Sequence, residues 1–228
     1  TLVPFAFAFS SLLKKDFSGW ISKTLPWALF SGAVLGTGIM MGGAWAYESL
    51  SFGGYWAWDP VENASLVPWL LMLAGLHTLL AFKKSGHALR TTFLFFISSF
   101  ILVLYSTFLT RSGILGNSSV HAFTDLGMSG QLLIYMAALS IPAIVLLIVQ
   151  WKNIPSNKNE EAADSREFWM FIGSLILLIS AAWITLDTSW PVWNKLFSPW
   201  LYKTPVTLGA EPVQHYNRIQ SPFGIIVL

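Results

Sequence analysis

The chain has 228 residues, of which 54% are hydrophobic and only 11% are charged. Soluble globular domains carry about 25% charged residues, so this composition argues against a water-soluble enzyme and favours a membrane protein. The net charge of +2 forms no clustered basic face, which argues against nucleic-acid binding. Because the chain has no cysteine, disulfides and thiolate metal sites are excluded, and a metal ion would need His, Met, Asp or Glu ligands.

Five apolar stretches approach the ~20 residues that a helix needs to cross a bilayer. They cover residues 27–46, 66–82, 91–109, 131–151 and 168–186. Residues 1–13 are expected to end an earlier span, and residues 222–228 to begin a later one, so we expect the chain to be an internal fragment of a longer protein. The expected fold is all-α: a polytopic transmembrane helix bundle that forms a single domain over residues 1–228.

Lysine and arginine are concentrated in every second connection between these spans. By the positive-inside rule these connections face the cytoplasm. They contain Lys14, Lys15, Lys23, Lys83, Lys84, Arg90, Lys152, Lys158 and Arg166. The opposite connections, residues 47–65, 110–130 and 187–220, are then outer loops, and they hold the unusual aromatic and polar residues.

A tryptophan-rich segment over residues 50–69 combines aromatic rings with two carboxylates. It contains Tyr55, Trp56, Trp58, Trp69, Asp59 and Glu62. An interfacial aromatic belt explains one or two tryptophans, but not the carboxylates between them. The alternative is an aromatic platform for a large planar ligand. Asp59 and Glu62 are expected to cap the next helix or to orient hydrogen-bond donors, because as anions they would repel an anionic ligand.

Three further residues extend this hypothesis to haem. Arg111, just after the predicted span 91–109, is either a snorkelling anchor or a partner for a haem propionate. His121, in the next outer loop, is placed to ligate the iron of a haem on the platform. His77 lies within a span; from spacing alone, a hydrogen bond to Ser98, Ser99 or Ser106 is favoured over ligation.

The other two histidines are not predicted to bind a ligand. His87 lies in a basic inner connection and is interpreted as a solvated surface residue, and His215 is interpreted as a residue of a flexible outer loop. No side chain is an obvious general acid, so no catalytic residue is assigned.

The stretch FGGYWAWDPVENASLVPWL resembles the WWD signature of the CcmF/NrfE family of haem lyases, which act in cytochrome c maturation. Four further stretches resemble the same family in the same order: PFAFAFSSL, GAWAYESL, TRSGILGNSSVHAF and HYNRIQSPFG. Two departures are visible. Phe52 stands where the family usually has tryptophan, and the loop between Gly113 and His121 is slightly longer than usual.

The resemblance implies a role in the bacterial inner membrane, with the WWD segment on the periplasmic side. A transit haem from the haem chaperone CcmE would lie on the WWD platform while thioether bonds form to the CXXCH segment of apocytochrome c. The resemblance also implies that His121 ligates this outer haem, and that His77 ligates a b-type haem within the membrane, which reverses the preference from spacing. Further implied partners are CcmH- and CcmI-type subunits and quinol.

Two other functions stay open. A haem transporter would show polar or broken helices near the bilayer midplane, and few such groups interrupt these spans. A structural assembly subunit would use its aromatic side chains to contact partner helices and would bind no haem.

Overall fold

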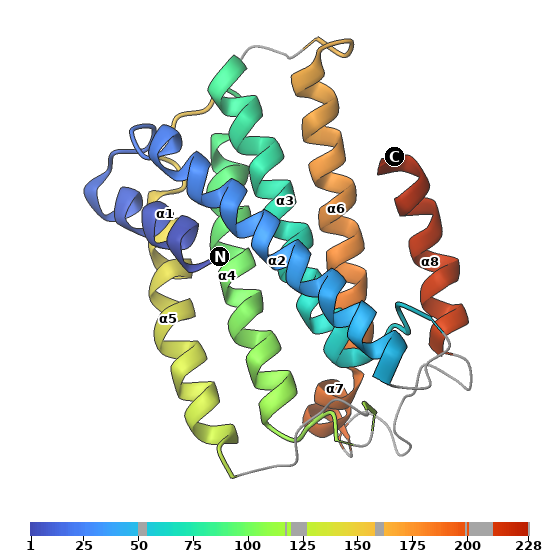
Figure 1. The fold of residues 1–228 in the computed structure, drawn as a ribbon. Helices are drawn as coiled ribbons and strands as arrows, with labels where there is room; N and C mark the ends of the chain where they lie inside the picture. The colour runs from blue at the N-terminus through green and yellow to red at the C-terminus, as the bar shows by residue number, and fades with distance from the viewer. Residues whose placement is uncertain are drawn as a thin grey trace.

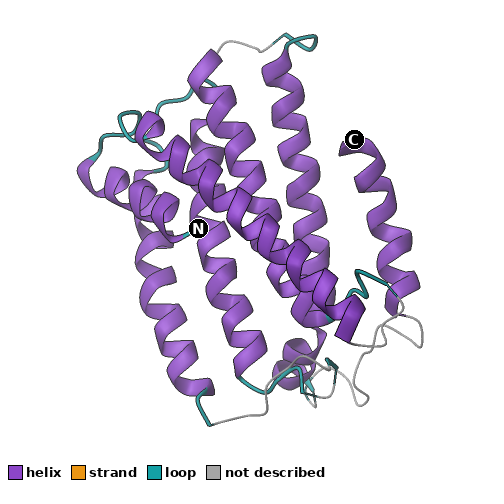
Figure 2. Cartoon of the chain, in the orientation of Figure 1, coloured by secondary structure: helices purple, strands orange, loops and turns teal. Residues whose placement is uncertain are grey.

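A computed structural model describes residues 1–49, 54–116, 118–119, 127–157, 162–198, 200 and 212–227. Within these ranges the chain is helical and contains no strand (Figure 2). The helices are α1 (Leu2–Lys14), α2 (Ile21–Ser49), α3 (Pro60–Ser85), α4 (Leu89–Arg111), α5 (Ser129–Gln150), α6 (Arg166–Thr188), α7 (Trp190–Phe197) and α8 (Pro212–Val227). The expected all-α helix bundle is therefore confirmed.

Among the described residues, helices α2 to α6 are long and apolar enough to cross a membrane, and they cover the five predicted spans except for Trp151, which follows the end of α5. The expected outer loop over 187–220 is not a loop throughout, because it contains α7 and the start of α8. The predicted start of the last helix at Pro222 was also too late. Proline is favoured in the first turn of a helix, but α8 already begins at Pro212 and tolerates Pro222 in its interior.

Helix α3 is the centre of the bundle. It packs against α4 and α6, and α2 crosses it diagonally (Figure 1). Close approach of α3 and α4 requires a small residue at Gly75. A Cβ atom there would lie 2.9 Å from Cε1 of Phe96 and 3.4 Å from Cβ of Phe95. The absence of a side chain therefore lets two buried phenylalanines of α4 pack directly on the α3 backbone.

A proline in α3 explains a polar contact between α3 and α4. Pro68 has no N–H, so the carbonyl of Ala64 loses its usual helical donor. The Ser106 hydroxyl of α4 donates a hydrogen bond to that carbonyl. One turn away, Ser99 Oγ donates to the Pro68 carbonyl at 2.8 Å. The serines of α4 thus donate hydrogen bonds to backbone carbonyls of α3, and lipid chains have no donor that could replace them.

The first prediction concerns the contact at Gly75. We expect Gly75→Ala to lower stability by about 1–3 kcal/mol, because the added methyl group overpacks the contact with Phe96. The matched control is Gly173→Ala in α6, where a Cβ atom would meet nothing within 4 Å. The control should be neutral or gain up to about 1 kcal/mol from helix propensity. Thermal unfolding of the purified protein in detergent measures both, and equal midpoints would contradict the packing described.

The second prediction concerns the carbonyl of Ala64. Ser106→Ala leaves it without its side-chain donor and should cost about 1–3 kcal/mol. Thr107→Ala is the control, because Thr107 is exposed and its hydroxyl bonds only to Val103 of its own helix among the contacts described. Urea unfolding followed by tryptophan fluorescence would show the difference, and a Ser106→Ala variant as stable as Thr107→Ala would refute this role.

Candidate functional site

The tryptophan-rich segment is tied to the start of α3 by a capping box. Asp59 is the N-cap residue, and its Oδ1 accepts a hydrogen bond from the Val61 amide at 2.9 Å. Oε2 of Glu62 accepts from the amides of Asp59 at 3.2 Å and of Ala57 at 3.0 Å. The two carboxylates therefore hold the backbone that precedes the helix, as a cap near a positive helix end should. The predicted capping role of Asp59 and Glu62 is confirmed.

Trp58 is held from three directions. Its backbone adopts a left-handed φ of 56°, which is unfavourable for a bulky residue and must be enforced by its surroundings. Asn63 Nδ2 donates to the Trp58 carbonyl at 3.0 Å. The indole Nε1 donates to Oδ1 of Asn217 at 2.7 Å, and the ring stacks on Tyr216 at 5.2 Å and 11°. These contacts attach the tryptophan-rich segment to α8.

A polar cluster behind Trp58 was not foreseen from the sequence. His215 was expected to be a flexible loop residue, but it lies in α8 with Nε2 2.9 Å from Oδ2 of Asp187. Next to it, the hydroxyl of Tyr216 lies 3.3 Å from that of Thr188. Tyr216 lies outside the five spanning helices, and its burial raises its pKa to about 12, so it stays neutral at physiological pH. The cluster joins the outer end of α6 to α8.

Trp56 faces a different space. Its ring is perpendicular to that of Trp58, with centroids 6.0 Å apart, so the two indoles form a corner and not a flat shelf. Trp56 lines a cavity of about 660 Å³ between α2 and the first turns of α3. Its Nε1 atom is buried and has no hydrogen-bond partner among the residues that the structure describes. A buried donor without a partner is costly, which makes Trp56 a candidate to bind a ligand acceptor.

Glycines of α2 form the opposite side of the cavity. A Cβ atom at Gly38 or Gly42 would meet nothing within 4 Å. The volume lies within the range of about 300–1,000 Å³ that is typical of ligand and cofactor sites. The cavity is apolar apart from a few groups such as Glu62 and Ser65. These properties fit a large, mostly apolar ring system with a polar edge.

The other predicted platform residues do not gather around this cavity. Tyr55 is exposed and stacks on Tyr47 of α2 at 4.4 Å. Trp69 lies deeper along α3, where Nε1 donates to the Gly32 carbonyl at 2.9 Å. Arg111 is the exposed last residue of α4. The predicted set is therefore divided: Trp56 lines the cavity, Tyr55 and Trp69 contact α2, and Trp58 contacts α8.

His121 lies outside the described residues, so its ligand role stays a prediction. The described part of the same outer loop does reach the cap of α3, because Ser119 Oγ donates to Oδ1 of Asp59 at 2.6 Å.

His77 is half-buried in α3, and its Nδ1 atom lies 2.8 Å from the Leu73 carbonyl. A carbonyl only accepts, so Nδ1 carries the proton and Nε2 presents its lone pair. The hydrogen bond that spacing favoured, to Ser98, Ser99 or Ser106 of α4, is not found among the described contacts, in which His77 bonds to its own helix. A backbone bond to one ring nitrogen is the arrangement that metal-ligating histidines use.

The two candidate sites lie far apart on the same helix. His77 follows the N-cap Asp59 by 18 positions, and a rise of about 1.5 Å per residue separates them by roughly 27 Å along α3. A ligand at Trp56 and a ligand at His77 would therefore be two different molecules.

Comparisons with known proteins show which family the chain resembles. Residues 6–115 match the family model of the cytochrome C assembly protein. The chain is 38% identical to the cytochrome c-type biogenesis protein CcmF of Haemophilus influenzae over 99% of the chain and 34% of the relative. It is 38% identical to CcmF of Pseudomonas aeruginosa over 83% of the chain and 29% of the relative. NrfE of Haemophilus influenzae is 38% identical over 77% of the chain and 27% of the relative.

A solved structure shares the fold. The chain superposes on the cytochrome c haem lyase CcmF with a TM-score of 0.71 and 29% identity, over 99% of the chain and 31% of that structure. The chain thus spans about a third of the length of the relatives it matches. Its sequence, its fold and its tryptophan-rich segment agree in one assignment: the chain belongs to the CcmF family of cytochrome c-type biogenesis proteins.

Proposed function

We propose that this chain is the haem-handling part of a cytochrome c haem lyase, with a transit haem in the cavity beside Trp56 and a b-type haem at His77. The observation that carries the proposal is the position of Trp56: it lines a cavity of about 660 Å³, and its buried indole N–H has no partner among the described residues. The names of the relatives, cytochrome c-type biogenesis protein and haem lyase, support the identity of that ligand.

At the outer site the chain acts by positioning. The Trp56 ring supplies a flat wall, and its N–H is available to a polar edge of the ligand. Glu62 is engaged by two backbone amides, so its charge stabilises the segment. Arg111 is proposed to bind a propionate from the outer end of α4, and His121 to ligate the iron. Bound haem supplies the vinyl groups to which the cysteine thiols of an apocytochrome add.

At the membrane site the chain holds the imidazole of His77 in a fixed orientation. Donation of Nδ1–H to the Leu73 carbonyl fixes both the tautomer and the orientation of His77. Its Nε2 would then be the atom that ligates the iron of a b-type haem, within a span where an unpaired imidazole would be costly. This role explains a half-buried histidine whose only described hydrogen bond is to its own helix.

The proposed setting follows from the relatives and from the charges. The basic connections between α3 and α4 and between α5 and α6 would face the cytoplasm of a bacterial inner membrane, with the tryptophan-rich segment on the periplasmic side. There it would receive haem from the chaperone CcmE and meet the CXXCH segment of apocytochrome c. CcmH- and CcmI-type subunits would complete the lyase, and quinol would supply electrons.

The third prediction tests the outer site by filling it. Gly42→Leu places a side chain in open cavity space, and steric overlap of about 1–3 kcal/mol should lower outer haem occupancy by about tenfold or more. Gly173→Leu on α6 is the control, since it also projects into open space but away from this cavity. Haem content and cytochrome c yield of the full-length protein are measured. Normal loading of Gly42→Leu would exclude this cavity as the haem site.

The fourth prediction tests the membrane site. His77→Ala should abolish the b-type haem absorbance of the full-length protein while leaving the outer haem, and added imidazole should restore part of the absorbance. His87→Ala, in the inner connection, should change neither. A structural role for His77 would not respond to imidazole. Full b-type haem absorbance in His77→Ala would show that another residue is the ligand.

A further inference from the structure

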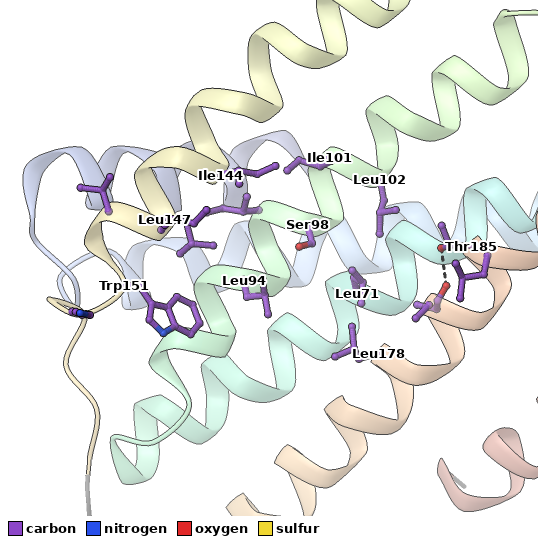
Figure 3. Close-up of a pocket in the computed structure, with 17 residues that line it drawn as sticks. Leu71, Leu94, Ser98, Ile101, Leu102, Ile144, Leu147, Trp151, Leu178 and Thr185 are labelled. Carbon is purple, nitrogen blue, oxygen red and sulfur yellow. Dashed lines mark hydrogen bonds between the residues drawn. The ribbon is translucent and has the colours of Figure 1, made fainter. Parts of the chain in front are cut away.

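A second, larger cavity lies on the other face of the bundle. It forms an apolar groove of about 1120 Å³ between α5 and α6, with α4 as its floor (Figure 3). Large aliphatic side chains form its wall, including Leu94, Ile101, Ile144, Leu147 and Leu178. The groove shares no lining residue with the cavity at Trp56. The proposed haem chemistry therefore makes no use of it.

The groove separates two helices that do not pack on each other. Among the described helices, α5 packs on α1 and α4, whereas α6 packs on α3, α7 and α8. The groove is lined by large branched side chains of α4 and α5 and by smaller residues of α6 such as Ala181, Ala182 and Thr185, so its surface is uneven. Flexible hydrocarbon chains fit such an irregular wall better than another helix does.

At its inner end the groove meets a polar cavity. Trp151 lines the apolar groove and also a cavity of about 630 Å³ that contains Arg90, Thr91, Asn157 and Glu167. Tryptophan is typical of the level where hydrocarbon meets headgroups. The two cavities together thus form a long apolar space with a charged space at its inner end.

The cavity at the inner end of the groove contains both cationic and anionic side chains. The Arg90 guanidinium lies 5.8 Å from the Trp151 ring, and its Nε and Nη2 atoms donate to the Ile154 carbonyl at 3.3 and 3.2 Å. Lys152 lines the adjoining end of the apolar groove. Glu167, at the start of α6, lines the same polar cavity as Arg90. A complementary headgroup therefore has an anionic and a cationic part.

We propose that these two cavities bind one phospholipid of the phosphatidylethanolamine type. Its phosphate would contact Lys152 and Arg90, its ammonium group would contact Glu167, and its acyl chains would fill the groove between α5 and α6. A lipid with only negative charge would bring no partner for Glu167, and an isoprenoid quinone has no charged headgroup. Basic pockets between membrane helices on the cytoplasmic side are known to bind lipid headgroups.

The fifth prediction uses native mass spectrometry of the delipidated full-length protein, titrated with palmitoyl-oleoyl phosphatidylethanolamine. We expect one tightly bound lipid. The double variant K152Q/E167Q should weaken its binding about tenfold, as expected for the loss of a charge-assisted hydrogen bond. Lys23→Gln, an exposed lysine at the start of α2, is the control for charge and should bind normally.

A second pair of variants tests the groove without altering its charges. Ala182→Phe narrows the groove and should displace the lipid, whereas Ile179→Phe on the exposed side of α6 should not. Equal or stronger binding of palmitoyl-oleoyl phosphatidylglycerol, or displacement of the lipid by equimolar ubiquinone, would overturn the assignment. So would unchanged lipid binding by Ala182→Phe.

Discussion

The cap at the start of α3 is the interaction on which the outer site depends. Glu62 accepts hydrogen bonds from the amides of Ala57 and Asp59, so the backbone between them cannot swing away from the helix. That restraint fixes the left-handed turn at Trp58 and sets the rings of Trp56 and Trp58 at right angles to each other. The indole of Trp58 then contacts α8, and the indole of Trp56 lines the cavity. On a free loop, the carboxylates of Asp59 and Glu62 would repel a haem. Here they cap α3 and hold the tryptophan-rich segment in place.

Helix α3 also connects the capped tryptophan-rich segment to His77, the proposed membrane site. Its first turns carry the cap, its middle packs against α4 through Gly75, and His77 lies roughly 27 Å beyond the cap. Such rigid spacing keeps an outer ligand and a membrane ligand apart. The groove between α5 and α6 shares no lining residue with the cavity at Trp56, so a lipid bound there would leave the proposed outer haem site open.

Hydrophobic length predicted the five spans correctly, because a bilayer imposes the same requirement on every spanning helix. The capping role of Asp59 and Glu62 was also predictable, since it depends on neighbouring residues. Contacts between segments that lie far apart in the sequence were not predictable. The pairing of His215 with Asp187 and the stack of Trp58 on Tyr216 require α8 to fold back against α6. Likewise, only the structure shows that Trp69 packs against α2, far from Trp56.

The most direct test is the haem stoichiometry of the full-length protein carrying Glu62→Ala. Removing this carboxylate frees the amides of Ala57 and Asp59 while leaving His77 and every cavity wall formed by α2 unchanged. Optical spectroscopy with chemical haem quantification distinguishes the two haems. The account predicts loss of the outer haem with full retention of the b-type haem. Retention of both haems would contradict the claim that the cap of α3 builds the outer site.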